Sequence, residues 1–124
     1  MYQLHSPKSK TGDEQKKITA MLVQHYRKVL GFQQKALPFV QFARQLNDVV
    51  EALGLRVSYQ TIKNWEDGIH RPDYFFTLQL ANHAPEGSWQ RAFAMDLLAV
   101  QWPMLYEPGS EIGEKYSKEL LQNP

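Results

Sequence analysis

The sequence of 124 residues contains no cysteine, which excludes a disulfide framework, a cysteine-based zinc site and a thiol nucleophile. It also contains no apolar run near the roughly 18 residues that a membrane-spanning helix needs. The polar stretch from Met1 to Gly12 lacks the apolar segment of a secretory signal peptide. We therefore expect a soluble, cytoplasmic protein that makes no membrane contact.

The motifs of the common enzyme classes are missing as well. No Gly-rich phosphate-binding loop and no paired-carboxylate motif occurs, and Ser58 has no His or Asp partner in a recognisable motif. The four histidines (His5, His25, His70 and His83) are too scattered along the chain to predict a metal site. We predict that the protein is not an enzyme, and we expect no cofactor and no metal ion.

The net charge of +1 conceals a gradient along the chain. Residues 1–37 contain seven Lys or Arg against two acids (+5), residues 38–80 contain four against five (−1), and residues 81–124 contain three against six (−3). A basic front and an acidic rear are typical of a protein that binds a polyanion with its front end. A solvated basic tail would explain the same composition without any partner.

Apolar residues recur at helical spacing, and no stretch alternates as a half-buried strand would. The clearest stripe consists of Ile18, Met21, Leu22, Tyr26 and Val29. Helices are expected at about residues 13–30, 38–53, 58–67 and 73–82, from residue 88 to the Pro103 break, and at 111–121. The fold class predicted from this pattern is all-α.

Residues with capping chemistry bound most of the expected helices. Asp13, Ser58 and Ser88 are expected N-caps, and Gly54 is expected to end the second helix. The alternative for that helix is a break near residues 47–48, because Asn and Asp side chains compete for backbone hydrogen bonds.

The helix expected at residues 58–67 has two unlike sides. At about 100° per residue, Ile62 and Trp65 fall together and mark the buried side, with Trp65 as a core anchor. The other side has hydrogen-bonding side chains and few acids: Tyr59, Gln60, Thr61, Lys63 and Asn64. Gln and Asn pair with adenine edges, Lys reaches guanine or phosphate, and a Thr methyl contacts the thymine methyl. This face favours nucleic acid over an ordinary solvated surface, which would have more Glu–Lys pairs.

The segment around this helix contains a characteristic string. An apolar helix ending in Leu53-Gly54 is followed by Ser58, by Thr61-Ile-Lys-Asn-Trp-Glu-Asp-Gly68 and by Arg71-Pro72. In this order the chain resembles the Xre family, the lambda-repressor-like helix-turn-helix DNA-binding domains, over about residues 14–83.

The resemblance implies a helix-turn-helix bundle of about five helices with a C-terminal helical extension. The expected division is a flexible basic tail at 1–12, a DNA-binding domain at 13–84, and the extension at 85–124 as a candidate dimerisation segment. Double-stranded DNA is the expected partner, bound with helix 58–67 in the major groove.

The resemblance also implies site residues. Base contacts are expected from Tyr59, Gln60, Thr61, Lys63 and Asn64. Phosphate contacts are expected from Lys35, Gln41, Arg56, Ser58, His70 and Arg71. Glu66 is expected to pair with Arg27 in a structural role.

Two features depart from the family pattern. The link from Gly54 to Ser58 is about two residues longer than usual, and the second helix is long if it continues to Leu53. Asp67 would repel phosphate near DNA, so we expect its side chain to angle away at the far end of its helix.

Trp89 and Trp102 flank the helix that begins near Ser88, whose apolar content allows either core packing or a dimer interface. We expect the dimer, because operator palindromy and protein two-fold symmetry accompany each other in this architecture. The predicted function is a transcriptional regulator, a repressor that occludes its promoter. The alternative is a protein-interaction module on the same scaffold, such as an antitoxin, that binds a protein partner through its C-terminal third.

Overall fold

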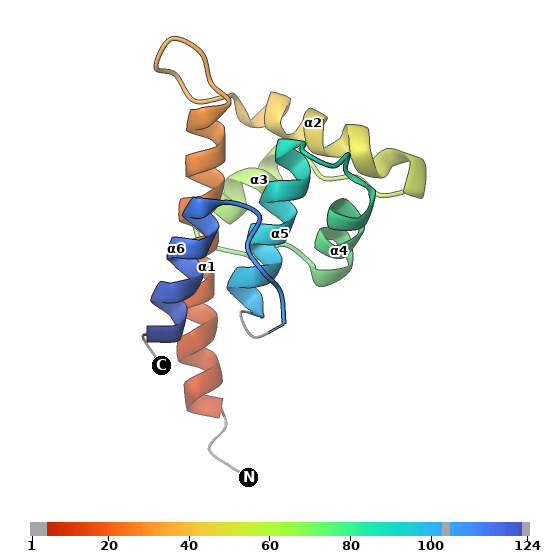
Figure 1. The fold of residues 1–124 in the computed structure, drawn as a ribbon. Coiled ribbons are helices and arrows are strands. Elements are labelled where there is room, and N and C mark those ends of the chain that lie inside the picture. The colour runs from red at the N-terminus through yellow and green to blue at the C-terminus, as the bar shows by residue number, and fades with distance from the viewer. Residues whose placement is uncertain (1–4, 103–104, 123–124) are drawn as a thin grey trace.

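The computed structural model describes residues 5–102 and 105–122, and the side chains of residues 12–102 and 105–116. Its helices are α1 (His5–Val29), α2 (Phe39–Val50), the 3-10 turn η1 (Glu51–Leu53), α3 (Tyr59–Glu66), α4 (Tyr74–His83), α5 (Trp89–Gln101) and α6 (Glu111–Gln122) (Figure 1). In this part of the chain, β pairing is limited to an isolated bridge between Phe32 and Lys35. The predicted all-α class is therefore confirmed.

The helices are arranged around α5. Figure 1 shows α5 at the centre, with α4 on one side, α1 and α6 on the other, and α2 across one end of the bundle. The short α3 packs against both α1 and α2. None of the described helices is long and apolar enough to cross a membrane.

Aromatic rings from α1, α2 and α5 meet in the core. Phe42 and Phe93 are fully buried, with ring centroids 5.4 Å apart in an edge-to-face arrangement. The Tyr26 ring lies 5.1 Å from that of Phe93. Such pairs stabilise a core by about 0.5–1.5 kcal/mol beyond the burial of their area. Because Phe42 precedes the predicted division at residue 84 and Phe93 follows it, one continuous core spans both segments.

The first helix begins earlier than predicted. α1 starts at His5, so Asp13 lies inside the helix rather than at its N-cap, and residues 5–12 are helical rather than a tail. Pro7 sits in the first turn, where its missing N–H removes no helical hydrogen bond. The first residues of the predicted tail, 1–4, lie outside the described residues. At the other end Val29 is 65% exposed, so it does not belong to the predicted buried stripe.

The α-helical part of the second helix ends at Val50 and is not broken at residues 47–48. It continues as η1 and ends at Gly54, whose φ of 79° is left-handed, as expected for a helix stop. Asn47 does not break the helix, because its side-chain amide bonds to a different segment. Asn47 Nδ2 donates to Val57 O at 2.8 Å, and Val57 N donates to Asn47 Oδ1 at 2.8 Å. These two hydrogen bonds hold the long link before α3.

The apolar side chains of α5 pack into the core of this chain. Phe93, Leu97, Leu98 and Val100 are all buried in the core. The two flanking tryptophans also have partners, since Trp89 packs 4.8 Å from Phe42 and Trp102 packs 4.8 Å from Tyr74 between ring centroids. Core packing therefore explains the apolar residues of this helix and its two flanking tryptophans. The homodimer stays a prediction, and these residues no longer support it.

A buried carboxylate ties α5 to α1 and α6. Asp96 is fully buried and accepts hydrogen bonds from Tyr26 Oη at 2.6 Å and from Ser110 Oγ at 2.6 Å. The backbone N–H groups of Gly109 and Ser110 donate to it at 2.8 and 3.1 Å. Gly113 is required beside it, because a Cβ there would lie 2.0 Å from Asp96 Oδ1. Burial raises the pKa of the Asp96 carboxyl, although the hydrogen bonds from Ser110, Tyr26 and the backbone act in the opposite direction.

Candidate nucleic-acid interface

α3 is fixed to the bundle along its apolar side. Ile62 and Trp65 are 0% and 3% exposed, and the Trp65 ring lies 6.1 Å from that of Phe76. At the end of the helix, Arg27 Nη1 on α1 lies 2.6 Å from Glu66 Oε1, and both side chains are largely buried. The expected roles of Trp65 as a core residue and of Arg27–Glu66 as a structural pair are confirmed. The opposite side of α3 is therefore held outward.

The N-terminal end of α3 has the predicted cap. Ser58 Oγ accepts a hydrogen bond from Thr61 N at 3.1 Å and lies 3.0 Å from Thr61 Oγ1. The cap satisfies one of the free N–H groups of the first turn. The contact between the two hydroxyls uses only one of their two hydrogens, so the other can donate to a ligand without breaking the cap.

The outward face of α3 consists of side chains that bond to one another along the helix. Gln60 Nε2 donates to Asn64 Oδ1 at 3.1 Å, and Lys63 Nζ lies 2.9 Å from Asp67 Oδ2. Tyr59, at the start of this face, is 53% exposed. Pairs one turn apart on an exposed helix contribute only about 0.2–0.5 kcal/mol each. These partners can therefore be exchanged for contacts with a ligand.

Asp67 does not angle away from this face as expected. It is the C-cap residue of α3, and its carboxylate pairs with Lys63, because residues four apart on a helix lie on the same side. The Lys63 ammonium is therefore partly neutralised in the free protein.

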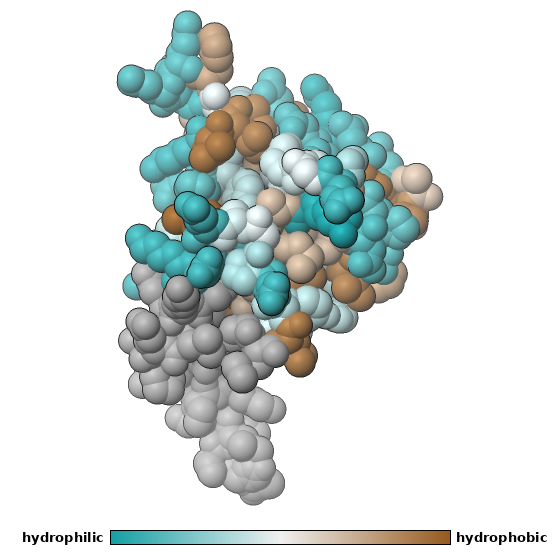
Figure 2. Space-filling model, viewed as in Figure 1, coloured by the Kyte–Doolittle hydropathy of each residue, from teal (hydrophilic) through white to brown (hydrophobic). Residues whose placement is uncertain are grey.

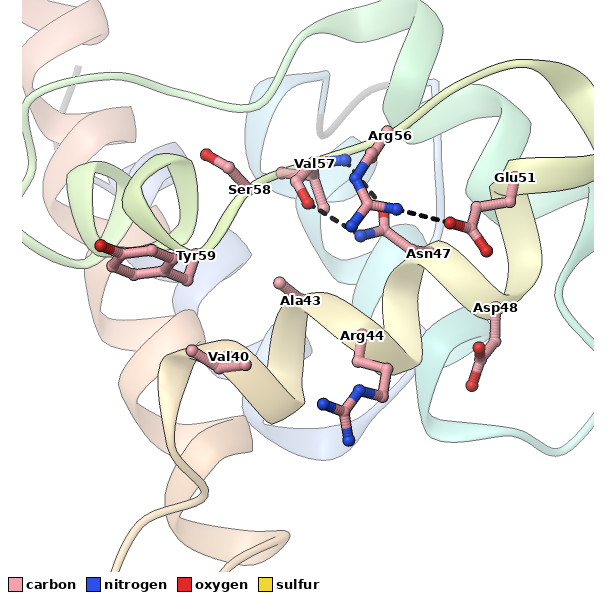
Figure 3. Close-up of a pocket in the computed structure, with 10 residues that line it drawn as sticks. All are labelled: Val40, Ala43, Arg44, Asn47, Asp48, Glu51, Arg56, Val57, Ser58 and Tyr59. Atoms are coloured by element: carbon pink, nitrogen blue, oxygen red, sulfur yellow. Dashed lines mark hydrogen bonds and ion pairs between the residues drawn. The ribbon is translucent and has the colours of Figure 1, made fainter.

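A hollow of about 330 Å³ lies between α2 and the N-terminal end of α3 (Figure 3). Arg56 and Ser58, two of the predicted phosphate contacts, line it together with Tyr59. Arg56 Nη1 lies 2.6 Å from Glu51 Oε2, so its charge is offset by a neighbour in a solvent-exposed pair. The hollow also contains Arg44, which forms no ion pair with any residue that the structure describes.

A second hollow, of about 290 Å³, lies beside α3 and shares Arg56 and Val57 with the first. It unites predicted base contacts with predicted phosphate contacts: Arg56, Thr61, Asn64, His70 and Arg71. Arg71 Nη1 is hydrogen-bonded to Gln15 Oε1 on α1. Gln15 Nε2 in turn donates to Gln101 O at 3.0 Å, so the backbone of α5 supports Arg71 through this amide.

Two predicted phosphate contacts lie apart from both hollows. Lys35 is exposed on the connection between α1 and α2, and Gln41 is exposed on the first turn of α2. Neither residue lines the hollows beside α3.

Two residues of the site were not predicted. Arg44 could have been found from its neighbours, because it follows Gln41 by three residues on the same exposed side of α2. Asn47 was interpreted only as a helix breaker, and nothing in the spacing indicates its partner Val57. Its position beside Leu46 in an apolar stripe is the one available signal that its amide would need a buried partner.

The described residues contain no group of three or more His, Cys, Asp or Glu side chains that could hold a metal ion. The outer face of α3 presents amide, hydroxyl and ammonium donors and the Asp67 carboxylate, and the hollows beside it add guanidinium donors. Such donors recognise hydrogen-bond acceptors and phosphate by binding.

The chain matches no protein-family model, and neither a curated protein nor a solved structure is detectably similar to it. The resemblance to the Xre family therefore stays a prediction from the sequence.

Proposed function

We propose that the protein binds double-stranded DNA in a sequence-dependent manner, with α3 in the major groove. The observation that supports this most is the construction of α3 itself. Its buried side and the Arg27–Glu66 pair fix the helix, while Gln60, Lys63 and Asn64 project on a face whose partners are exposed and weakly held. Rigid positioning of a helix with exchangeable donors is what base-edge recognition requires.

The surrounding charges support the same proposal. Arg44 and Arg56 line the hollow between α2 and α3, and Arg56 and Arg71 line the second hollow beside α3. Guanidinium groups beside a helix in the major groove would meet the phosphate backbones that border it. Phosphate contacts fix the register of a helix on the duplex, and base contacts then supply specificity.

The proposal extends to a cytoplasmic transcriptional regulator that represses by occluding a promoter. A homodimer on a palindromic operator is the expected assembly, because two copies of α3 would contact half-sites one helical turn apart. Salt should weaken binding in proportion to the number of phosphates contacted.

The binding test compares matched amide variants. Gln60→Ala and Asn64→Ala remove proposed base contacts, whereas Gln24→Ala on α1 and Asn82→Ala on α4 remove exposed amides elsewhere. In fluorescence anisotropy with a duplex recovered by selection, each α3 variant should lose about 1–3 kcal/mol of binding free energy. The two controls should bind as the wild type does. Equal affinity of all five proteins would contradict the assignment of α3 as the base-contacting helix.

A second candidate is a protein-interaction module, favoured by exposed aromatic and aliphatic side chains near the start of α4. Tyr74, Phe75 and Leu105 are 43%, 56% and 75% exposed, and Tyr74 Oη lies 2.9 Å from Tyr106 Oη. Exposed apolar patches mark protein interfaces. An antitoxin would combine this surface with DNA binding. Failure of the wild type to bind any duplex in a salt-dependent manner would favour this candidate.

A further inference from the structure

The connection between α1 and α2 closes in a two-residue hairpin turn. Phe32 N donates to Lys35 O at 3.0 Å, and Lys35 N donates to Phe32 O at 3.1 Å. The two residues between them, Gln33 and Gln34, have φ angles of 52° and 66°. Positive φ at both central positions is the geometry of a type I′ turn.

This backbone conformation is unfavourable for the residues that adopt it. Type I′ turns favour Asn-Gly, because the short polar side chain of Asn tolerates positive φ and Gly has no Cβ. Gly31 permits the turn, since a Cβ at that position would lie 1.8 Å from Lys35 O. Strained backbone of this kind concentrates at functional sites, where the side chains it displays are used.

The turn displays an aromatic ring to solvent. Phe32 is 78% exposed and the neighbouring Val29 is 65% exposed, while Gln33, Gln34 and Lys35 are exposed around them. In Figure 1 this connection extends beyond the ends of α1 and α2. Figure 2 shows hydrophobic and hydrophilic residues side by side on the same projection. An apolar ring so placed contributes nothing to the core.

The surrounding segment has one sign of charge. No Asp or Glu occurs between Glu14 and Asp48, an interval that contains six Lys and Arg residues. Two of them, Lys28 and Lys35, flank the turn directly. An exposed ring within a basic segment fits duplex DNA, whose phosphates are anionic and whose base steps can be opened by an inserted apolar side chain.

The base of the hairpin is fixed to α3 by a single side chain. Arg27 Nε donates to Leu37 O at 2.8 Å, and Arg27 Nη1 bonds to Glu66 Oε1 at 2.6 Å. The same guanidinium lies 3.7 Å from the ring centroid of Phe39. Arg27 therefore joins α3 to Leu37, the residue at which the hairpin leads into α2.

We infer that the hairpin at residues 31–36 is a second DNA-contacting element, which enters the minor groove next to the major groove occupied by α3. Phe32 acts as an apolar wedge against a base step, and Gln33 and Gln34 donate to the minor-groove acceptors of A·T pairs. Lys28 and Lys35 contact the phosphates on either side. This inference rests on the proposed function of α3.

The first test removes the wedge. Phe32→Ala alters only an exposed side chain, and Phe75→Ala, at a ring 56% exposed on α4, is its matched control. With the full chain and a duplex recovered by selection, Phe32→Ala should weaken binding about tenfold, which equals about 1.4 kcal/mol. Phe75→Ala should not change affinity. In hydroxyl-radical footprinting, Phe32→Ala should lose a protected minor-groove segment beside the α3 site.

The second test relaxes the turn. Replacing Gln33 by Asn and Gln34 by Gly installs the residues that this geometry favours, so the melting temperature should rise. Binding to the same duplex should nevertheless weaken, because the two donors are shortened or lost. A turn with only a structural role would show the gain in stability without the loss of affinity.

The outcomes separate the two proposals. If the wild type binds duplex DNA and Gln60→Ala alters its preferred site, while Phe32→Ala and the turn variant keep both affinity and footprint, the hairpin inference is wrong and the α3 proposal stands. If the wild type binds no duplex, both are overturned. If Phe32→Ala instead lowers the molecular mass in sedimentation, Phe32 contacts a second copy of the chain and the hairpin inference is overturned.

Discussion

Two regions of the molecule are rich in side-chain hydrogen bonds, and they differ in what surrounds them. Around Asp96 the carboxylate is fully buried, and its donors come from α1 and from the residues that precede α6. On α3 the Gln60–Asn64 bond and the Lys63–Asp67 pair lie at the surface, within one helix. The first region joins segments that are distant in the sequence, whereas the second joins neighbours only.

The difference separates the structural role of a polar group from a role in binding. A buried acceptor must keep its donors, because losing them costs the desolvation of the group. An exposed pair on a helix contributes little and is replaced by water or by a ligand at small cost. The Asp96 cluster therefore serves the fold, and the face of α3 is free to serve binding.

The largest expected effect on stability comes from replacing the buried Asp96. Asp96→Ala would leave Tyr26 Oη, Ser110 Oγ and two backbone N–H groups without their acceptor. We expect the free energy of unfolding in urea to fall by about 3 kcal/mol. Tyr26→Phe, which removes one donor, should cost about 1 kcal/mol. If Asp96→Ala lost less unfolding free energy than Tyr26→Phe, the cluster would not hold α6.

Asn47→Ala should have the next largest effect, because it removes a buried amide that lies next to the interface. The N–H and C=O of Val57 would lose their partners, and the free energy of unfolding should fall by about 2 kcal/mol. DNA affinity should fall as well, since the link that places Ser58 and α3 is loosened. The control is Asp48→Ala, an exposed neighbour that should change stability little. Equal stability of the two variants would contradict this role of Asn47.

The pH dependence of stability gives a second test of the buried Asp96 cluster. Because burial raises the pKa of Asp96 above its ordinary value of 3.8, the folded state binds more protons than the unfolded state just above that pH. The contribution of Asp96 to the free energy of unfolding is therefore greatest below pH 3.8 and declines as the pH rises toward the folded-state pKa. The difference in unfolding free energy between wild type and Asp96→Asn should fall with rising pH, by at most about 1.4 kcal/mol per pH unit. A difference that grows with pH would show that the folded-state pKa of Asp96 is lowered rather than raised.

The smallest expected effect on stability concerns the exposed pair on α3. Asp67→Ala should change the free energy of unfolding by no more than about 0.5 kcal/mol. It should nevertheless strengthen DNA binding at low salt, because Lys63 loses a competing carboxylate and the duplex loses a repelling one. Anisotropy titrations at two salt concentrations measure this. Unchanged affinity at low salt would place Asp67 and Lys63 away from the duplex.

Helix positions could be predicted where the signal is local. Ser58 and Ser88 each accept a hydrogen bond from the third residue that follows, as their predicted capping roles require. The burial of Ile62 and Trp65 follows from helical periodicity. The start of α1 could not be found in this way, because neither Gly12 nor Asp13 interrupts the helix that contains them.

The parts that escaped prediction depend on distant partners or on unusual backbone. Asp96 bonds to Tyr26 across 70 positions, and periodicity alone cannot pair them. The hairpin at Gln33-Gln34 lacks the Asn-Gly signature by which such turns are recognised. The Arg27–Glu66 pair was expected only because the chain resembles a known family.

The most direct measurement of whether α3 contacts bases is parallel selection of duplexes from a random pool with the wild type and with Gln60→Ala. The wild type should enrich a defined site, and Gln60→Ala should enrich a site relaxed at one or two positions within it, since only the contacted base pairs lose discrimination. Enrichment of the same site at the same stringency by both proteins, or no enrichment by the wild type, would contradict the proposal that the outer face of α3 recognises DNA sequence.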